Sequence, residues 1–361
     1  MLPVICFFET EKYIYSTDYE LLSCADSVSV TKFLTAIENK FADQMKIVQV
    51  NFDAYSLGLT SKQKKLYENS KAVVFILKNY EIISLDEIKK RQSPLPSLVT
   101  PFELLATRNE FIEKVIQIKN MIAAGRFYQV NLTCAFKALL KTNPIDFFLN
   151  NCANYTGNYK AFLPLKGHSV ISFSPELFLD KTGSTLKTEP IKGSISKEEN
   201  SDTHLLKSAK EEAELSMIVD LLRNDLNSLE TNSSAEVVKH REVMNLNYIQ
   251  HTYSEVRIQT EKHLPLILEK MMPGGSISGC PKKESLMAIS ELEPTARAVY
   301  TGAIGFWKNN DFKLNIAIRT FVQTEDAYYY FAGCGIVYDS NPEKEFAELI
   351  NKAGRLNVQY K

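Results

Sequence analysis

The feature that most constrains the fold of this 361-residue sequence is the order of its strand-like segments, which follow one another in groups. Segments rich in β-branched and aromatic residues lie at 127–136, 159–165 and 168–179, and again at 243–258, 298–307, 313–323 and 327–339. A strict alternation of strands and helices favours a parallel, doubly wound sheet, whereas grouped strands favour antiparallel pairing. The sequence therefore predicts an α+β fold with antiparallel sheets.

Apolar residues recur with the period of a helix in three segments. These segments are 108–124, 206–226 and 342–353. Thr107 and Glu110 form a capping-box pattern at the start of the first segment, and Gly125 stands where that helix would end. Pro342 opens the last segment, at a position where proline is favoured in a helix.

The chain is expected to divide near residue 100. Three prolines in the run 94–101 indicate a joint between elements that is too short to be a free linker. We expect residues 1–100 to form a short N-terminal part integrated with the fold, and residues 101–361 to form the domain that carries the chemistry. Within the N-terminal part, the first apolar run predicts a strand and the Lys-rich segment 61–70 predicts a helix.

Composition argues against several classes of protein. The 42 Lys and Arg residues nearly balance the 43 Asp and Glu residues, which disfavours nucleic acid or an anionic membrane as the main partner. The opening residues lack the positive region of a signal peptide, and no apolar run is long enough to span a bilayer. The six cysteines show no CxxC spacing, so we expect reduced thiols in a cytoplasmic protein and no structural zinc site.

Two of the predicted helices each carry a pair of glutamates in register with an apolar face. Glu214 lies one turn before Ile218, and Glu211 lies almost one turn earlier; Glu345 and Glu348 are three residues apart on the last helix. Taken alone, each pair of glutamates more often lies on the solvated surface of a helix. The two pairs together favour a shared site for a hard cation such as Mg²⁺, which binds one or two protein carboxylates and oxygens of a substrate.

Other unusual positions are an arginine, a lysine and a glycine-rich turn. Arg319 interrupts an apolar strand-like run, and arginine suits bidentate binding of a carboxylate. Lys192 lies between a proline turn and a glycine, where a lysine is usually just solvated. His251 lies in a strand-like run, where a lone histidine is more often structural. The turn at 273–285 is not a phosphate-binding loop, because Cys280 and a proline replace the required Lys-Ser/Thr. Together these residues suit a small dicarboxylate held by a divalent cation.

Eight motifs follow one another along the chain, namely GRFYQVNLT, SFSPELF, AELSMIVDLLRNDL, HTYSEV, PGGSISGCPK, YTGAIGFW, AIRTF and GCGIVYDSNPEKEFAELINKA. In this order they resemble the chorismate-utilising enzymes, a family that includes anthranilate synthase component I, isochorismate and salicylate synthases, and aminodeoxychorismate synthase component I. They cover the chain from about residue 105 to its C-terminus. The resemblance implies an α/β sandwich of large antiparallel sheets flanked by helices, with a central cleft and a chorismate-binding domain over 101–361.

The resemblance also implies a role for individual residues. Lys192 matches a nucleophile that attacks the chorismate ring, and Glu176 matches the general acid that protonates the departing hydroxyl. Glu214 and Glu348 match the Mg²⁺ ligands, with Glu211 and Glu345 acting on the metal indirectly, through water. The implied substrate-binding residues are Arg319 and Tyr300 at the enolpyruvyl carboxylate, Ser276, Gly333 and Gly335 as donors, Lys352 near the metal, His251 lining the site, and Gln129 in place of a water-activating lysine.

The PIKGS motif around Lys192 indicates the aminodeoxychorismate synthase branch, because anthranilate synthases resemble PIAGT there. The expected reaction is amination of chorismate by ammonia to 4-amino-4-deoxychorismate, on the route to 4-aminobenzoate and folate. We find no fused glutaminase or lyase and no tryptophan-pocket LLES motif, so a separate glutamine amidotransferase subunit is the expected source of ammonia. Three departures from the family pattern are Ser194 for Thr, Glu189 for Arg and Cys280 for Ala.

Two alternatives stay open at this point. The protein could instead be an anthranilate synthase component I or an isochorismate or salicylate synthase, which the identity of the product would decide. A third reading is a non-catalytic binding subunit, for which Glu176→Gln would have no consequence.

Overall fold

The computed structural model describes residues 2–9, 11–55, 63–95, 100–139, 142–155, 157–196, 209–230, 232–246, 249–353 and 358–360. Within these ranges the side chains of 194–196, 209–211, 213, 245, 246 and 249 are not described. The predicted metal-site residue Glu211 and the serine of the PIKGS motif, Ser194, therefore lie outside the described side chains.

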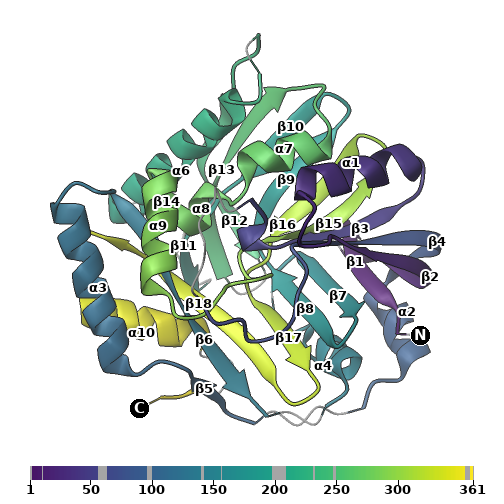
Figure 1. Ribbon diagram of the computed structural model, residues 1–361, viewed down its shortest axis with the longest axis horizontal. Coiled ribbons are helices and arrows are strands. Elements are labelled where there is room, and N and C mark those ends of the chain that lie inside the picture. The colour runs from purple at the N-terminus through teal and green to yellow at the C-terminus, as the bar shows by residue number, and fades with distance from the viewer. Residues whose placement is uncertain are drawn as a thin grey trace.

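Helices and strands alternate irregularly along the chain (Figure 1). The helices are α1 (Val30–Lys40), the 3-10 helix η1 (Phe52–Tyr55), α2 (Leu85–Gln92), α3 (Arg108–Ala123), α4 (Pro144–Asn151), α6 (Ala209–Asn227), α7 (Leu264–Met271), α8 (Gly275–Ser278), α9 (Lys282–Leu292) and α10 (Pro342–Ala353). The first ten strands are β1 (Val4–Glu9), β2 (Lys12–Ser23), β3 (Lys46–Val50), β4 (Ala72–Ser84), β5 (Phe102–Leu104), β6 (Gln129–Ala138), β7 (Tyr159–Leu165), β8 (His168–Ser174), β9 (Leu177–Thr182) and β10 (Thr185–Glu189). The others are β11 (Ile191–Ser196), β12 (Glu236–Leu246), β13 (Ile249–Gln259), β14 (Gly279–Cys280), β15 (Ala303–Lys308), β16 (Asp311–Ile316), β17 (Thr320–Thr324), β18 (Tyr328–Val337) and β19 (Val358–Gln359).

The described strands join into one continuous network of hydrogen-bonded neighbours. One half runs β5, β6, β18, β17, β8, β7, β1, β2, β4 and β3. The other half continues through β15, β16, β9, β10 and β13, which carries both β11 and β12. Every pairing between the described strands is antiparallel except that of β19 with β5. The predicted α+β fold with antiparallel sheets is confirmed.

The N-terminal part shares this network with the rest of the chain. Strand β1 pairs with β7, and β3 pairs with β15, so strands before residue 100 are built into the sheet of strands after it. The N-terminal strands form one side of the molecule in Figure 1. The boundary at residue 100 itself stays a prediction.

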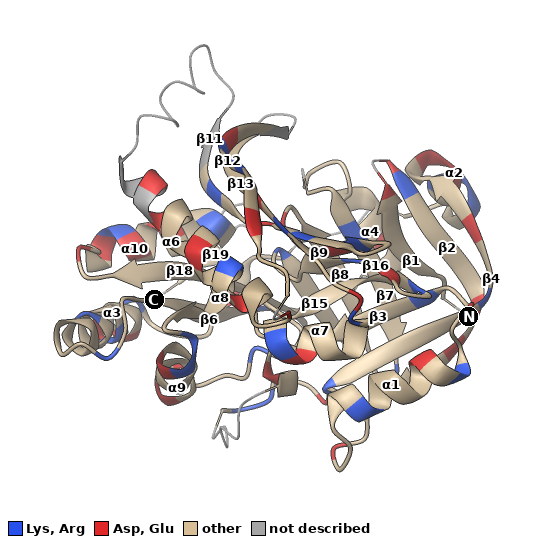
Figure 2. Ribbon diagram, turned by 90° about the horizontal axis from the view of Figure 1, so that it is seen from above, with Lys and Arg blue, Asp and Glu red and all other residues tan. Residues whose placement is uncertain are grey.

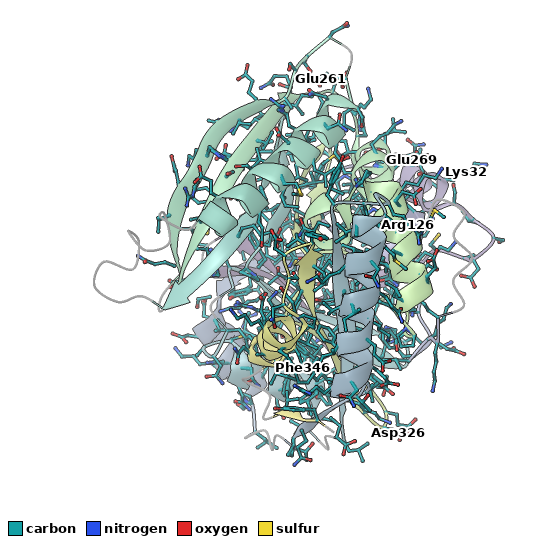
Figure 3. All side chains as sticks on the ribbon, turned by 90° about the vertical axis from the view of Figure 1, so that its left-hand side faces the viewer. Lys32, Arg126, Glu261, Glu269, Asp326 and Phe346 are labelled. Carbon is teal, nitrogen blue, oxygen red and sulfur yellow. The ribbon has the colours of Figure 1, made fainter. Side chains whose placement is uncertain are left out.

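Two helices that lie far apart in sequence pack side by side on the outer face of the β6–β18 region. The capping box that was predicted at Thr107 and Glu110 is present at the start of α3, and Gly125 follows its end with φ of 76°. Phe111 of α3 and Phe346 of α10 have ring centroids 5.8 Å apart, and Figure 3 shows Phe346 next to α3. This contact holds α10, with its glutamates, over strand β18.

The structure corrects several predicted elements. The described part of the Lys-rich segment, 63–70, is not helical: Lys64 forms a parallel bridge with Thr295 instead. Backbone bonds join the Lys64 N–H to the Pro294 carbonyl (2.8 Å) and the Ala296 N–H to the Lys64 carbonyl (3.0 Å), so tertiary contacts override helix propensity. The predicted strands 168–179 and 313–323 are each divided in two, and β15 begins five residues later than predicted.

The surface carries both signs of charge over most elements (Figure 2). All six cysteines belong to the described residues and are free, and only Cys280 is more than slightly exposed. Among the described helices, none is both long enough and apolar enough to cross a bilayer.

Candidate functional site

A cavity of about 620 Å³ collects most of the residues that the sequence predicted for the site. Its walls include twelve of the predicted residues, namely Glu176, Lys192, Glu214, His251, Ser276, Tyr300, Arg319, Gly333, Gly335, Glu345, Glu348 and Lys352. They come from helices α6, α8 and α10, from the turn at Tyr300 and from both halves of the strand network. The structure therefore brings these side chains together, while their chemical roles stay predictions.

The two strand interruptions face each other at the cavity. Strand β8 pairs with β17 and β9 pairs with β16, so the break around Glu176 lies opposite the break around Arg319. The Ile316 N–H donates to the Glu176 carbonyl, and the Phe173 N–H donates to the Arg319 carbonyl, each over 3.1 Å. Arg319 has φ of 50°, a value that is uncommon for a residue with a side chain. Matched breaks in two neighbouring strands thus free both side chains to line the cavity.

Glu176 is a buried carboxyl group, with 7% of its surface exposed. Burial raises its pKa, while the nearby Lys192 and a hydrogen bond from Ser276 act in the opposite direction. The Ser276 hydroxyl donates to Glu176 Oε1 over 3.0 Å, from the short helix α8. A carboxyl group with a raised pKa keeps its proton at higher pH than an exposed glutamate and can donate it in a reaction.

A β-bulge at Gly193 sets the direction of Lys192. The pairing of β11 with β13 shifts register between Lys192 and Ser194, and Gly193 has φ of 66°. Bulges of this kind re-aim a side chain next to an active site. The Thr252 hydroxyl donates to the Lys192 carbonyl over 2.6 Å, which fixes the backbone on one side of the bulge.

His251 supports the same bulge from β13. Its Nδ1 lies 3.0 Å from the Gly193 carbonyl, which can only accept, so Nδ1 carries the proton. Burial, together with the positive charge of Arg319, lowers the pKa of His251 to about 4 although the Gly193 carbonyl favours its charged form. The ring is therefore neutral near pH 7, with Nε2 as the acceptor nitrogen.

The open edge of β18 forms another wall. Strand β17 pairs with β18 only over Tyr328–Tyr330, so no described strand covers this edge at Gly333 and Gly335. Lys352 Nζ donates to the Gly333 carbonyl over 2.9 Å, which shows that the backbone polar groups of Gly333 point away from β6. Because this direction repeats every second residue in an antiparallel ladder, those of Gly335 point the same way. Backbone groups of both glycines can therefore meet a ligand.

Carboxylates from two helices approach the cavity, as the helix periodicity predicted. Glu214 reaches it from α6, and Glu345 and Glu348 reach it from α10. Glu345 is 4% exposed and accepts a hydrogen bond from the Ser340 hydroxyl over 2.8 Å. Glu348 pairs with Lys352 over 2.8 Å. Ligand atoms of Glu345, Glu348 and Cys334 all lie within 4.8 Å of one another, so this region could hold a cation.

Gln129 is the one predicted residue with a described side chain that does not line the cavity. Gln129 is buried, and a Cβ atom on Gly335 would lie 2.6 Å from Gln129 Nε2. Glu211 belongs to α6, but its side chain lies outside the description. The Gln129 side chain therefore lies against Gly335, and its role at the site stays a prediction.

Sequence reasoning missed several residues of the wall, namely Asn131, Tyr155, Pro175, Ile191, Ile277, Ile318, Tyr330, Phe331, Ala332 and Asn351. Asn131 could have been found, because it lies two residues from Gln129 and on the same face of β6. Asn351 could also have been found, because it lies one turn after Glu348. The aromatic residues carry no such signal: the stacking of Tyr300 on Phe331, with centroids 5.4 Å apart, depends on tertiary structure.

Comparisons to known proteins show the family and the fold. A family model described as chorismate binding enzyme matches residues 11–357, and the chain belongs to this family. Aminodeoxychorismate synthase component 1 of Bacillus subtilis is 34% identical over 266 residues, which cover 71% of this chain and 56% of that protein. Anthranilate synthase component 1 1 of Haloarcula marismortui is 35% identical over 272 residues, covering 73% of this chain and 56% of that protein. The chain thus matches little more than half the length of these relatives.

Solved structures share the whole architecture. Anthranilate synthase component I from Streptococcus pneumoniae superimposes with a TM-score of 0.81 at 26% identity, over 99% of this chain and 91% of that one. The menaquinone-specific isochorismate synthase from Escherichia coli gives a TM-score of 0.78 at 17% identity, over 99% of this chain and 89% of that one, which shows a common fold.

Proposed function

We propose that this protein aminates chorismate with ammonia to form 4-amino-4-deoxychorismate. The observation that carries this proposal is the presence in one cavity of a lysine, Lys192, and a buried carboxyl group with a raised pKa, Glu176. A nucleophile and a general acid are the two groups that a displacement of a ring hydroxyl requires.

The proposed reaction proceeds in two displacements. The neutral amine of Lys192 forms a bond to a ring carbon, the double bond shifts, and the hydroxyl takes the Glu176 proton and leaves as water. Ammonia then forms a bond to the carbon that lost the hydroxyl, the double bond shifts back, and the bond to Lys192 breaks. The new ammonium group returns one proton to Glu176. The net change is replacement of a hydroxyl by an amine, with water released.

The remaining walls suit the two carboxylates of chorismate. Arg319 and Tyr300 lie on one wall, where a guanidinium and a phenol can bind the enolpyruvyl carboxylate. The open backbone groups of Gly333 and Gly335 can bind another part of the substrate, beside Lys352. Neutral His251 contributes no charge that would compete with these contacts.

We further propose that Glu214 and Glu348 hold Mg²⁺, with Glu345 acting on the ion through water. Carboxylate oxygens are the ligands that this ion prefers, and the three side chains reach the same cavity from two helices. When bound, the ion would neutralise charge on a substrate carboxylate. The Ser340 hydroxyl donates to Glu345 over 2.8 Å and orients its buried carboxylate, whose ligand atom lies within 4.8 Å of that of Glu348.

Glu348→Gln is expected to raise the Mg²⁺ concentration needed for half-maximal activity by roughly 10–100-fold, the loss typical when the surroundings of a bound metal are altered. Binding of Mn²⁺, followed by electron paramagnetic resonance, should weaken in parallel. Glu343→Gln is the matched control, because Glu343 is exposed on the same helix and pairs with Arg108 outside the cavity. Equal Mn²⁺ affinity in the wild type and Glu348→Gln would contradict the assignment.

The ammonia is proposed to come from a separate glutamine amidotransferase subunit, as the words "component 1" in the names of the relatives suggest.

Anthranilate synthase is the second candidate function, because relatives with that name are equally similar to this chain. The test is to incubate purified protein with chorismate, Mg²⁺ and ammonium at mildly alkaline pH and to identify the product by mass and ultraviolet spectrum. Aminodeoxychorismate supports the proposal, and anthranilate or isochorismate would replace it.

A further inference from the structure

The outer edge of β6 is interrupted where this strand forms a wall of the cavity. Strand β14 pairs with the start of β6 at Gln129 and Val130, and β5 pairs with its end at Phe136 and Lys137. No described strand pairs with the edge between these two places. Asn131, which lines the cavity, lies in this gap.

A buried ion pair occupies the gap. The Thr133 N–H donates to Glu293 Oε1 over 2.9 Å, and Arg297 Nη2 donates to the Asn131 carbonyl over 2.6 Å. Arg297 binds Glu293 through two nitrogens, with Nη2 2.6 Å from Oε1 and Nε 2.9 Å from Oε2. The two side chains are 0% and 1% exposed. The pair thus supplies the acceptor and the donor that a neighbouring strand would have supplied.

The guanidinium of Arg297 also binds two further segments that flank the cavity. Arg297 Nη1 donates to the Ile277 carbonyl over 2.9 Å and to the Thr301 hydroxyl over 3.4 Å. Ile277 follows Ser276, the donor to Glu176, and the Thr301 hydroxyl donates to the carbonyl of Tyr300 over 2.5 Å. One side chain therefore joins β6, α8 and the turn that carries Tyr300.

We propose that Arg297, held by Glu293, is a positioning residue for the active site. It is not a catalytic residue, because it does not line the cavity. Instead it fixes three separate elements so that Asn131, Ser276 and Tyr300 keep their places around the substrate. An arginine is needed because its planar fork of five donors makes five hydrogen bonds here: two to the Glu293 carboxylate, two to carbonyls and one to the Thr301 hydroxyl. A lysine ammonium has only three donors on one atom and cannot replace all five. The kinetic consequence rests on the proposed function.

Arg297→Lys is expected to lower kcat/KM for chorismate by roughly 10–100-fold, because small displacements of positioning groups have effects of this size. It should also weaken chorismate binding in calorimetry and accelerate hydrogen exchange in peptides that cover residues 129–135 and 274–280. The matched control is Lys46→Met. Lys46 is a fully buried cation outside the cavity, and its Nζ donates to the carbonyls of Phe41 (2.7 Å), Gln44 (2.8 Å) and Ala42 (3.0 Å).

The control should lower Tm but change kcat/KM by no more than about twofold, because it disturbs none of the positioned elements. If Arg297→Lys also lowers Tm while keeping wild-type kcat/KM, the pair is merely structural and the proposal is overturned. Should Arg297→Lys not fold, Glu293→Gln keeps an acceptor for the Thr133 N–H and tests the same claim, since unchanged kinetics would again overturn it.

The proposed function can fail separately. If the wild-type protein forms no aminated product, the proposed amination of chorismate is contradicted, but the positioning role of Arg297 is not. Hydrogen exchange in the two peptides still decides that claim, because exchange equal to wild type in both variants would overturn it.

Discussion

Lys192→Ala is expected to lower the rate of aminodeoxychorismate formation by roughly 10³-fold or more, the scale seen when an enzyme loses its nucleophile. The substitution removes the amine that would form the covalent bond, while the bulge at Gly193 and its hydrogen bond to His251 remain. The folded structure and the affinity for chorismate should therefore change little. Steady-state rates with ammonium, together with calorimetric binding of chorismate, would separate loss of chemistry from loss of binding.

A second variant distinguishes a nucleophilic role of Lys192 from a purely electrostatic one. Lys192→Arg keeps a positive charge near Glu176, but a guanidinium stays protonated and has no free electron pair to attack the ring. We expect this variant to be as inactive as Lys192→Ala, whereas Lys166→Ala, at an exposed turn, should match the wild type. Substantial activity in Lys192→Arg would mean that Lys192 acts only by its charge and that the covalent route is wrong.

Local patterns predicted the parts of this fold that depend on neighbouring residues. The capping box at Thr107 and Glu110 formed because its two hydrogen bonds join residues three apart. Helical periodicity likewise placed Glu214 and Glu348 toward one cavity, since it fixes which side chains share a face. The grouping of strand-like segments was enough to predict antiparallel pairing.

Contacts between distant segments explain what the sequence did not reveal. The residues 63–70 are not helical, because Lys64 pairs with the backbone around Thr295, more than 200 residues away. The breaks at Glu176 and Arg319 were hidden for a similar reason: each segment taken alone is apolar enough for an unbroken strand. Only their pairing across β8–β17 and β9–β16 shows that the two breaks coincide. Local rules are often broken at functional sites, and here the broken strands carry a proposed acid and a proposed substrate-binding residue.

The Glu293–Arg297 pair illustrates the same limit. The two residues are four apart in the sequence, a spacing that is usually read as a surface helix pair. In the structure both side chains are buried, and the pair forms hydrogen bonds to β6 and α8. A sequence pattern cannot distinguish these two outcomes, because burial is decided by elements that arrive from elsewhere in the chain.

Glu176→Gln is expected to lower kcat by roughly 10²–10⁴-fold, which is the usual contribution of a general acid. Glutamine has nearly the same shape, and its amide oxygen can still accept the hydrogen bond from Ser276. It has no acidic proton to give to the departing hydroxyl. The loss should therefore fall on kcat, with the affinity for chorismate largely retained.

The pH dependence gives this prediction a second measurement. Glu176 acts as an acid only while protonated, so activity of the wild type should fall as pH rises through its pKa. Burial raises that pKa, against the opposing effects of Lys192 and Ser276, so the fall should occur at higher pH than for an exposed glutamate. The residual activity of Glu176→Gln should lack this alkaline fall. Glu255→Gln is the control, because Glu255 is equally buried but lies outside the cavity; it should affect Tm and leave the pH profile unchanged. A wild-type alkaline limb that persists in Glu176→Gln would assign the acid to another group.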